Sequence, residues 1–212
     1  MPLAEQLDLV TVLGGQLNGA RLLERQLQAK GPADDLAGPR PIMPRTAPGA
    51  GDYAGPVLDL SSLDLGEIAT ALADQTGYEH RWLINPQTGE IVFWTSDTGI
   101  DGQTPVDLDE LDLICIDPLP SCIWYQDMAD FADQISDERA GRRLAQAIQG
   151  KGAFRRFKAQ LHEEHPQLLP AWYAFRDARA YRRAAEWLAD NSLVADDAAA
   201  RFLDEHPEPN VP

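Results

Sequence analysis

The spacing of hydrophobic residues changes once along this chain, and that change limits the fold more than any other feature. Two runs rich in branched and aromatic residues, 80–84 and 90–95, flank the turn sequence NPQTG. A third short run, 113–116, precedes two prolines. From residue 124 onward, hydrophobic residues recur at helical intervals. Strands followed by helices, without alternation, predict an α+β fold with a small antiparallel sheet of about three strands and a bundle of four to five helices.

Local signals set the expected bounds of these elements. A helix capped by Ser62 or Asp64 is expected to run to about Gln75, before the strands. The run 90–95 is apolar on both faces, which favours a central or covered strand. The later helices are expected at 125–134, 137–149, 153–162, 169–190 and 194–203.

The beginning of the chain differs in character from the rest. Residues 1–30 have the apolar spacing of an amphipathic helix. Residues 31–56 contain six prolines and five glycines, which is typical of a linker. We therefore expect a helix (1–30), a linker (31–56), one α+β domain (57–205) and a tail (206–212). Because an isolated helix is marginal in water, the first helix should lie on its own domain or on a second copy, so a homodimer is one expectation.

Composition gives an expected compartment. No apolar run approaches the roughly 18 residues of a membrane helix, and no signal-peptide pattern is present. The two cysteines, Cys115 and Cys122, are separated by two prolines and match neither a redox motif nor a zinc half-site. We expect a cytoplasmic protein without a membrane partner.

Charge is divided unevenly along the chain, whose formal net charge is −16. Residues 57–137 hold 17 acidic residues and one basic residue, whereas residues 139–183 hold 11 basic and three acidic residues. Either the two segments neutralise each other inside the fold, or the surface is bipolar and offers a place for an anion.

The candidate anion site is the basic segment around a glycine-containing turn between two expected helices. Phe154 and Phe157 are expected to face the core, which would direct the intervening arginines to solvent. Backbone amides beside the glycines, together with arginine forks, suit phosphate or carboxylate. The expected anion-binding residues are Arg142, Arg143, Lys151, Gly152, Arg155, Arg156, Lys158 and Arg176. A nucleic acid is one expected partner, although an acidic protein repels a duplex unless its acidic face points away.

Several segments resemble a known family. They are the hairpin NPQTGE, residues 127–131 (DMADF), residues 144–158 (LAQAIQGKGAFRRFK), residues 172–176 (WYAFR) and residues 186–188 (EWL). Over residues 64–194 the chain resembles the bacterial family UPF0158, and the core GKGAFRRFK is specific. The family is named for having no assigned biochemical role, so the resemblance implies domain limits and no catalytic residues.

No catalytic set is recognisable in the sequence. The acidic stretch 97–117 does not match a calcium loop. The two histidines of residues 162–165 (HEEH) are three positions apart, whereas a zinc peptidase needs four. His80 has no evident partner in the sequence. We therefore expect no metal and no cofactor, and favour a non-enzymatic protein.

Three functions remain open. The first is a binding or regulatory protein that holds an anionic partner on a basic helical face. The second is an enzyme acting on a phosphorylated or carboxylated small molecule, in a cleft where an acid from 97–117 serves as base. The third is an assembly module that uses both charged faces for subunit contact.

Overall fold

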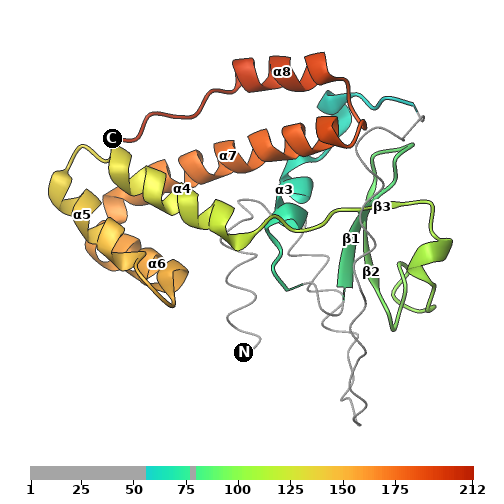
Figure 1. The fold of residues 1–212 in the computed structure, drawn as a ribbon, viewed down its shortest axis with the longest axis horizontal. Helices are drawn as coiled ribbons and strands as arrows, with labels where there is room; N and C mark the ends of the chain where they lie inside the picture. The colour runs from blue at the N-terminus through green and yellow to red at the C-terminus, as the bar shows by residue number, and fades with distance from the viewer. Residues whose placement is uncertain (1–55, 77–79) are drawn as a thin grey trace, which may run out of the picture.

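The computed structural model describes residues 56–76 and 80–212 (Figure 1). The expected N-terminal helix and all of the linker except Pro56 lie outside the described residues. The elements are α3 (Leu65–Ala73), β1 (His80–Ile84), β2 (Ile91–Thr95), β3 (Ile114–Cys115), α4 (Ser121–Gln134), α5 (Glu138–Ala147), α6 (Ala153–Glu164), α7 (Leu169–Asp190) and α8 (Asp196–Glu205). Short 3-10 helices lie at Leu60–Ser62, Leu108–Glu110 and Pro166–Leu168. The expected α+β class is confirmed.

The sheet is antiparallel with strand order β2-β1-β3. Its hairpin loop is held by Asn85, whose side-chain oxygen accepts hydrogen bonds from the backbone of Gln87 and Thr88. Gly89 has a φ of +76°, in the left-handed region that favours glycine, and a Cβ there would stand 2.2 Å from a methyl group of Leu63, whose side chain would have to shift. The sequence favoured the run 90–95 as a central or covered strand; the structure places β1 at the centre and β2 at an edge of the sheet. β1 supplies buried residues to both faces, whereas every residue of β2 is half-buried.

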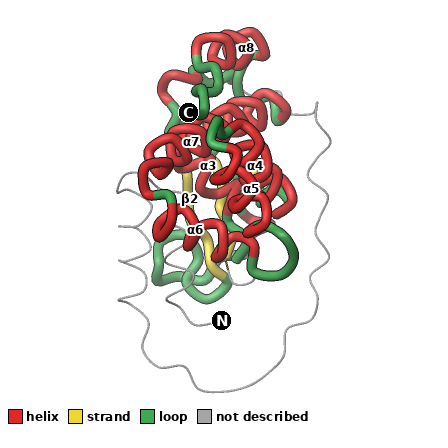
Figure 2. The backbone as a smooth tube through the Cα atoms, turned by 90° about the vertical axis from the view of Figure 1, so that its left-hand side faces the viewer, coloured by secondary structure: helices red, strands yellow, loops and turns green. Residues whose placement is uncertain are grey.

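Two hydrophobic clusters divide the core. One joins the sheet to α3, α8 and the second half of α7, and the other lies among α4, α5, α6 and the first half of α7. α7 takes part in both, with Phe175 in the helical cluster and Leu188 in the sheet cluster, each fully buried. Figure 1 shows the result, an elongated molecule with the sheet at one end and α5 and α6 at the other. Figure 2 views the molecule from the α5–α6 end, with strands behind the helices.

Local capping explains where the helices begin. Asp64 accepts a hydrogen bond from the backbone N–H of Glu67 and caps α3, so of the two expected capping residues the structure uses the second. Asp137 caps α5 by accepting from the N–H groups of Arg139 and Ala140, and these bonds lower the pKa of its carboxyl group. The expected span 169–190 agrees with α7, and the other helical bounds shift by up to four residues.

One side chain in α6 points differently from the expectation. Phe154 is 44% exposed, whereas Phe157 is buried at 2%. The core stripe of α6 consists of Ala153, Phe157 and Leu161, each four residues after the last, and Phe154, in the first turn, lies at the edge of this stripe.

The C-terminal tail folds back along the helices. Residues 206–212 run to the junction of α4 and α5, where the backbone N–H of Ser136 donates to the carbonyl of Pro212 at 3.0 Å (Figure 1). Val211 packs against the helical cluster. Within the described residues, no helix has the length and apolar character needed to cross a membrane.

Candidate functional site

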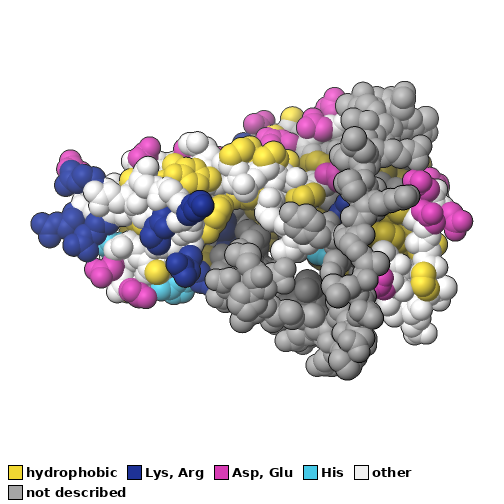
Figure 3. All heavy atoms as spheres, turned by 60° about the horizontal axis from the view of Figure 1, so that its bottom comes forward, with side chains coloured by type: hydrophobic (Ala, Val, Ile, Leu, Met, Phe, Trp, Pro, Cys, Tyr) yellow, Lys and Arg dark blue, Asp and Glu magenta, His cyan; other side chains and the backbone are white. Residues whose placement is uncertain are grey.

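The basic end of the molecule is formed by α5, α6 and the turn 148–152 between them, which we call the α5–α6 hairpin. Residues 138–158 hold seven basic residues and one acidic residue. Figure 3 shows lysine and arginine side chains gathered at this end of the surface. The hairpin therefore carries a local excess of positive charge in an acidic protein.

Two glycines give the turn its shape. Gly150 and Gly152 have φ values of +73° and +76°, which lie in the left-handed region that other residues avoid. A Cβ at Gly150 would meet no atom within 4 Å, whereas one at Gly152 would lie 3.4 Å from a guanidinium nitrogen of Arg156. The backbone thus turns closely around one arginine.

The side chain of Arg156 is hydrogen-bonded within the turn itself. Its Nε donates to the carbonyl of Ala147 at 3.0 Å, and its terminal nitrogens donate to the carbonyls of Gln149 and Lys151. These carbonyls lie at the negative end of the α5 dipole, where a cation is stabilising. Arg156 therefore serves as a C-terminal cap of α5 and offers little to an external anion.

Lys151 and Arg155, unlike Arg156, have side chains that face solvent. Both side chains are exposed, and neither has a hydrogen-bond or ion-pair partner among the residues that the structure describes. Gly152 is the N-cap of α6 and no side chain caps that helix, so the first amides of α6 face the same region. Lys158 is half-buried and already takes part in an interaction.

Two cations of α5 form exposed ion pairs. Arg142 lies 3.1 Å from Glu138, with side-chain exposures of 70% and 83%, and Arg143 lies 3.2 Å from Glu164. Such pairs contribute about 0–1 kcal/mol, so an anionic partner can replace the carboxylate at small cost. Arg143 and Arg156 also line a groove of about 480 Å³ between α5 and α6, together with Glu163 and Glu164. This mixture of acids and bases suits an anion less well than the turn does.

Arg176 lies away from this surface. Its side chain is 5% exposed and donates to Asp177 from Nε at 2.9 Å and from a terminal nitrogen at 2.5 Å. The guanidinium also packs over the ring of Tyr173 at 5.1 Å. Of the eight expected anion-binding residues, the structure gathers seven on the hairpin and places Arg176 outside it.

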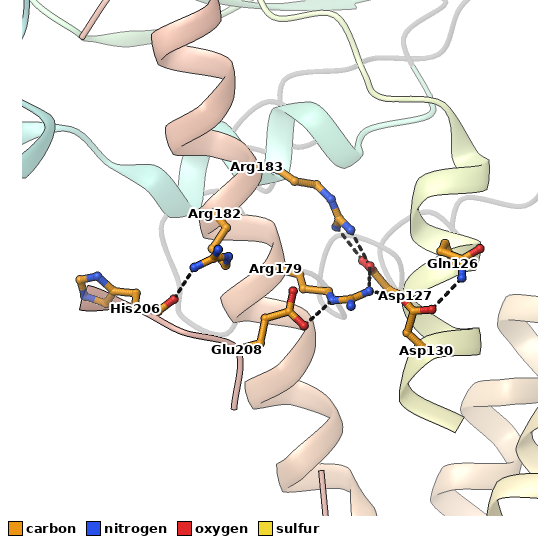
Figure 4. A network of polar contacts seen from close by, with 8 residues as sticks. All are labelled: Gln126, Asp127, Asp130, Arg179, Arg182, Arg183, His206 and Glu208. Atoms are coloured by element: carbon orange, nitrogen blue, oxygen red, sulfur yellow. Dashed lines mark hydrogen bonds and ion pairs between the residues drawn. The ribbon is translucent and has the colours of Figure 1, made fainter. Parts of the chain in front are cut away.

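The remaining arginines of α7 form hydrogen bonds and ion pairs with α4, with the end of α8 and with the C-terminal tail (Figure 4). Asp127 of α4, whose side chain is 1% exposed, accepts from Arg179 at 3.0 Å and from Arg183 at 2.7 and 2.5 Å. Arg179 also forms ion pairs with Asp130 and with Glu208 of the tail, the latter at 3.0 Å. We call this set the α4–α7 network.

Two further features concern α7 and its partners. Arg182 donates to the carbonyls of Leu203 and His206 at 2.5 and 2.8 Å, which ties the end of α8 to α7. Burial opposes ionisation of Asp130, but its bonds from Arg179 and Gln126 outweigh this and lower its pKa. Sequence reasoning placed one arginine of α7, Arg176, with the basic surface and gave Arg179 and Arg183 no partner. The sequence did contain a signal for the network. Asp127 and Asp130 are three positions apart, and Arg179 and Arg183 are four apart, so each pair lies on one face of its helix.

A second polar cluster, partly buried, lies where the sheet meets α3. Asp74 accepts hydrogen bonds from Nε2 of His80 at 2.7 Å, from Nε1 of Trp82 at 2.8 Å and from Thr76. His80 stacks on Phe93 with 4.6 Å between ring centroids. Burial acts against the charged carboxylate, but these hydrogen bonds dominate and lower the pKa of Asp74. No local sequence pattern predicted the contact between Asp74 and His80.

The acidic loop, residues 97–117, lies at the other end of the molecule from the α5–α6 hairpin (Figure 1). Its carboxylates organise the loop: Asp101 accepts from the backbone of Gln103 and Thr104, and Asp107 accepts from that of Asp109. Among the residues the structure describes, no three His, Cys, Asp or Glu side chains converge in a way that could hold a metal ion.

Cys115 is poorly suited to act as a nucleophile. Burial, together with the nearby Asp117 carboxylate, raises the pKa of its thiol to about 12. A reactive cysteine needs a lowered pKa and an electropositive setting, and this thiol has neither.

Comparison with known proteins places the chain among relatives without an assigned activity. A family model described as "Uncharacterised protein family (UPF0158)" matches residues 65–205. The chain is similar to "UPF0158 protein PA5073" of Pseudomonas aeruginosa, with 31% identity over 139 residues that cover 62% of this chain and 84% of the relative. No solved structure matches the chain.

Proposed function

The chain belongs to the uncharacterised protein family UPF0158, and we propose that it is a non-enzymatic binding or regulatory protein that holds an anionic partner on the α5–α6 hairpin. One observation carries the proposal. Lys151 and Arg155 stand exposed, without partners among the described residues, in a segment with seven basic residues and one acidic residue. A cationic group left unpaired at one end of an acidic protein attracts anions and repels cations.

The arrangement favours binding over catalysis. The enzyme alternative requires a carboxylate of the loop 97–117 within hydrogen-bond reach of a substrate held by the hairpin. The loop and the hairpin instead lie at opposite ends of the molecule (Figure 1). The part of the chain that the structure describes therefore supports a binding surface better than a reaction cleft.

Charge reversal at the hairpin tests the proposal. Affinity of the full chain for inorganic polyphosphate would be measured for the wild type and for Arg155→Glu. The matched control is Arg201→Glu, since Arg201 is also exposed, at 65%, but lies on α8. We expect binding that weakens with added salt, a loss in Arg155→Glu and little change in the control. No binding by the wild type, or equal losses in both variants, would refute the proposal.

Two expectations about the setting remain proposals. Both cysteines, Cys115 and Cys122, are free thiols, which agrees with a reducing cytoplasm. A homodimer formed through residues 1–30 rests on the sequence pattern alone. Light scattering of the full chain, compared with a chain beginning at Val57, tests the dimer: an unchanged number of subunits removes the role given to the first segment.

A further inference from the structure

Phe154 is the feature of the hairpin that simple anion binding leaves unexplained. Four large hydrophobic side chains are exposed among the described residues: Val57, Ile100, Phe154 and Tyr181. Of these, Phe154 alone lies in the hairpin, in the first turn of α6. Leaving a phenylalanine in water forgoes part of the roughly 1.5–3 kcal/mol that its burial would contribute.

The neighbours of Phe154 are basic. Arg155 follows it directly, and Lys158 lies four residues later and hence one turn along the same face. Lys151 precedes it by three residues, in the turn that leads into α6. Phe157 and Leu161, further along α6, are buried in the core, whereas Phe154 in the first turn lies at the edge of this buried stripe. An exposed aromatic ring thus stands among cations at the tip of the basic end.

We propose that the anionic partner is a single-stranded polynucleotide, with one base stacked on Phe154 and neighbouring phosphates bound by Lys151 and Arg155. This inference rests on the proposed function and adds the class of ligand. Proteins that bind single strands combine a positive surface with exposed aromatic rings, because every base has a π-face that can stack. A duplex keeps its bases paired and stacked, and so could use the cations but not the ring.

An acidic protein segment fits the same surface less completely. Its carboxylates would pair with Lys151 and Arg155, but it offers no regular succession of aromatic faces for Phe154. A polynucleotide supplies phosphates and stacking faces in alternation along one chain. It therefore accounts for both the charge and the ring.

The acidic net charge of the protein does not forbid this partner. α7 has 22 residues and reaches from the helical cluster to the sheet cluster, so it spans about 33 Å at 1.5 Å per residue. The acidic loop lies on the sheet side of the molecule (Figure 1). The Debye length at physiological salt is about 8 Å, so the field of that loop is largely screened at the hairpin.

Fluorescence anisotropy of the full chain with labelled oligouridylate and oligothymidylate tests the inference and separates RNA from DNA. Phe154→Ala is the central variant, Phe154→Tyr the conservative rescue, and Tyr181→Ala the matched loss of an exposed aromatic ring elsewhere. Stacking on a ring predicts a loss of affinity of about 5- to 150-fold in Phe154→Ala. Phe154→Tyr should restore most of it, and Tyr181→Ala should change little. Because Phe154 is exposed, its removal should leave the thermal midpoint nearly unchanged, which a melting curve checks.

Inorganic polyphosphate, duplex DNA and polyglutamate are the competitors that decide among partners. We expect Phe154→Ala to leave polyphosphate binding unchanged and the wild type to prefer single strands over the other three. Single-strand affinity that is unaffected by Phe154→Ala, or a preference for duplex or polyglutamate, would overturn the inference while leaving anion binding intact. If no polyanion binds at all, the proposed function fails with it.

Discussion

The positive side chains of α7 and those of the α5–α6 hairpin have the same chemistry and opposite environments. In the α4–α7 network, Arg179 and Arg183 meet the buried carboxylate of Asp127 and pack over aromatic rings. In the hairpin, Lys151 and Arg155 face solvent without a partner among the described residues. The difference teaches that a positively charged run in a sequence contains two populations: arginines that hold helices together, and cations that remain available to a ligand.

The largest effect should come from breaking the α4–α7 network. Asp127→Ala leaves the partly buried Arg183 without a carboxylate partner and removes one of the three partners of Arg179, so we expect the free energy of unfolding to fall by about 3–5 kcal/mol. Urea unfolding measures the change. Asp133→Ala is the matched control, since Asp133 is exposed on the same helix. Similar losses in both variants would mean that the network contributes no more than helix propensity does.

Neighbouring arginines in α6 should separate structure from binding. Arg156→Ala removes the donors to the α5 carbonyls and should cost about 1.5–3 kcal/mol of unfolding free energy. Arg155→Ala should leave stability nearly unchanged while weakening polyanion binding. Thermal melts and the polyphosphate titration, run on both variants, test this division. If the two variants behave alike, the assignment of Arg156 to the turn is wrong.

Acid should act on the α4–α7 network through Asp130. Its folded-state pKa lies below the unfolded value of about 3.9, so its contribution is present above that pH and is lost as the pH falls through the folded value. Asp130→Asn should cost up to about 1 kcal/mol at neutral pH. The difference from the wild type should shrink as the pH falls below about 4. Unfolding measured across this pH range tests the sign, and a difference that grows with acid would contradict it.

The smallest stability effect is expected in the exposed pair of α5. Glu138→Gln removes the partner of Arg142 and should change the unfolding free energy by about 0.3–0.5 kcal/mol. It also releases a cation to the basic end, so polyphosphate binding should tighten. Unchanged affinity would show that Arg142 lies outside the binding surface. Glu205→Gln, an exposed change of equal charge on α8, is the control.

Much of the fold could be read from local pattern. The loop between β1 and β2, a helix cap at Ser62 or Asp64 and the span of α7 followed from spacing and turn chemistry, because these depend on residues close in the sequence. The orientation of Phe154 did not. A pattern search favours phenylalanine over alanine in the core, but the structure buries Ala153 in the helical cluster and leaves Phe154 44% exposed.

The candidate site was only partly predictable for a related reason. The α5–α6 hairpin and its cations are contiguous in sequence, so the position of the basic turn could be predicted. The partners of Arg179 and Arg183 lie about fifty residues earlier, on α4, and the partner of Arg176 is its own neighbour. Periodicity does not say which faces of two distant helices meet.

The amino-acid sequence by itself determined the order and type of the elements, the family and the division of charge, because helix and strand periods and composition act over short stretches of chain. Only the tertiary structure decided which positive groups are buried in ion pairs and which remain exposed. That choice depends on desolvation, and a side chain loses its water only when distant segments pack over it.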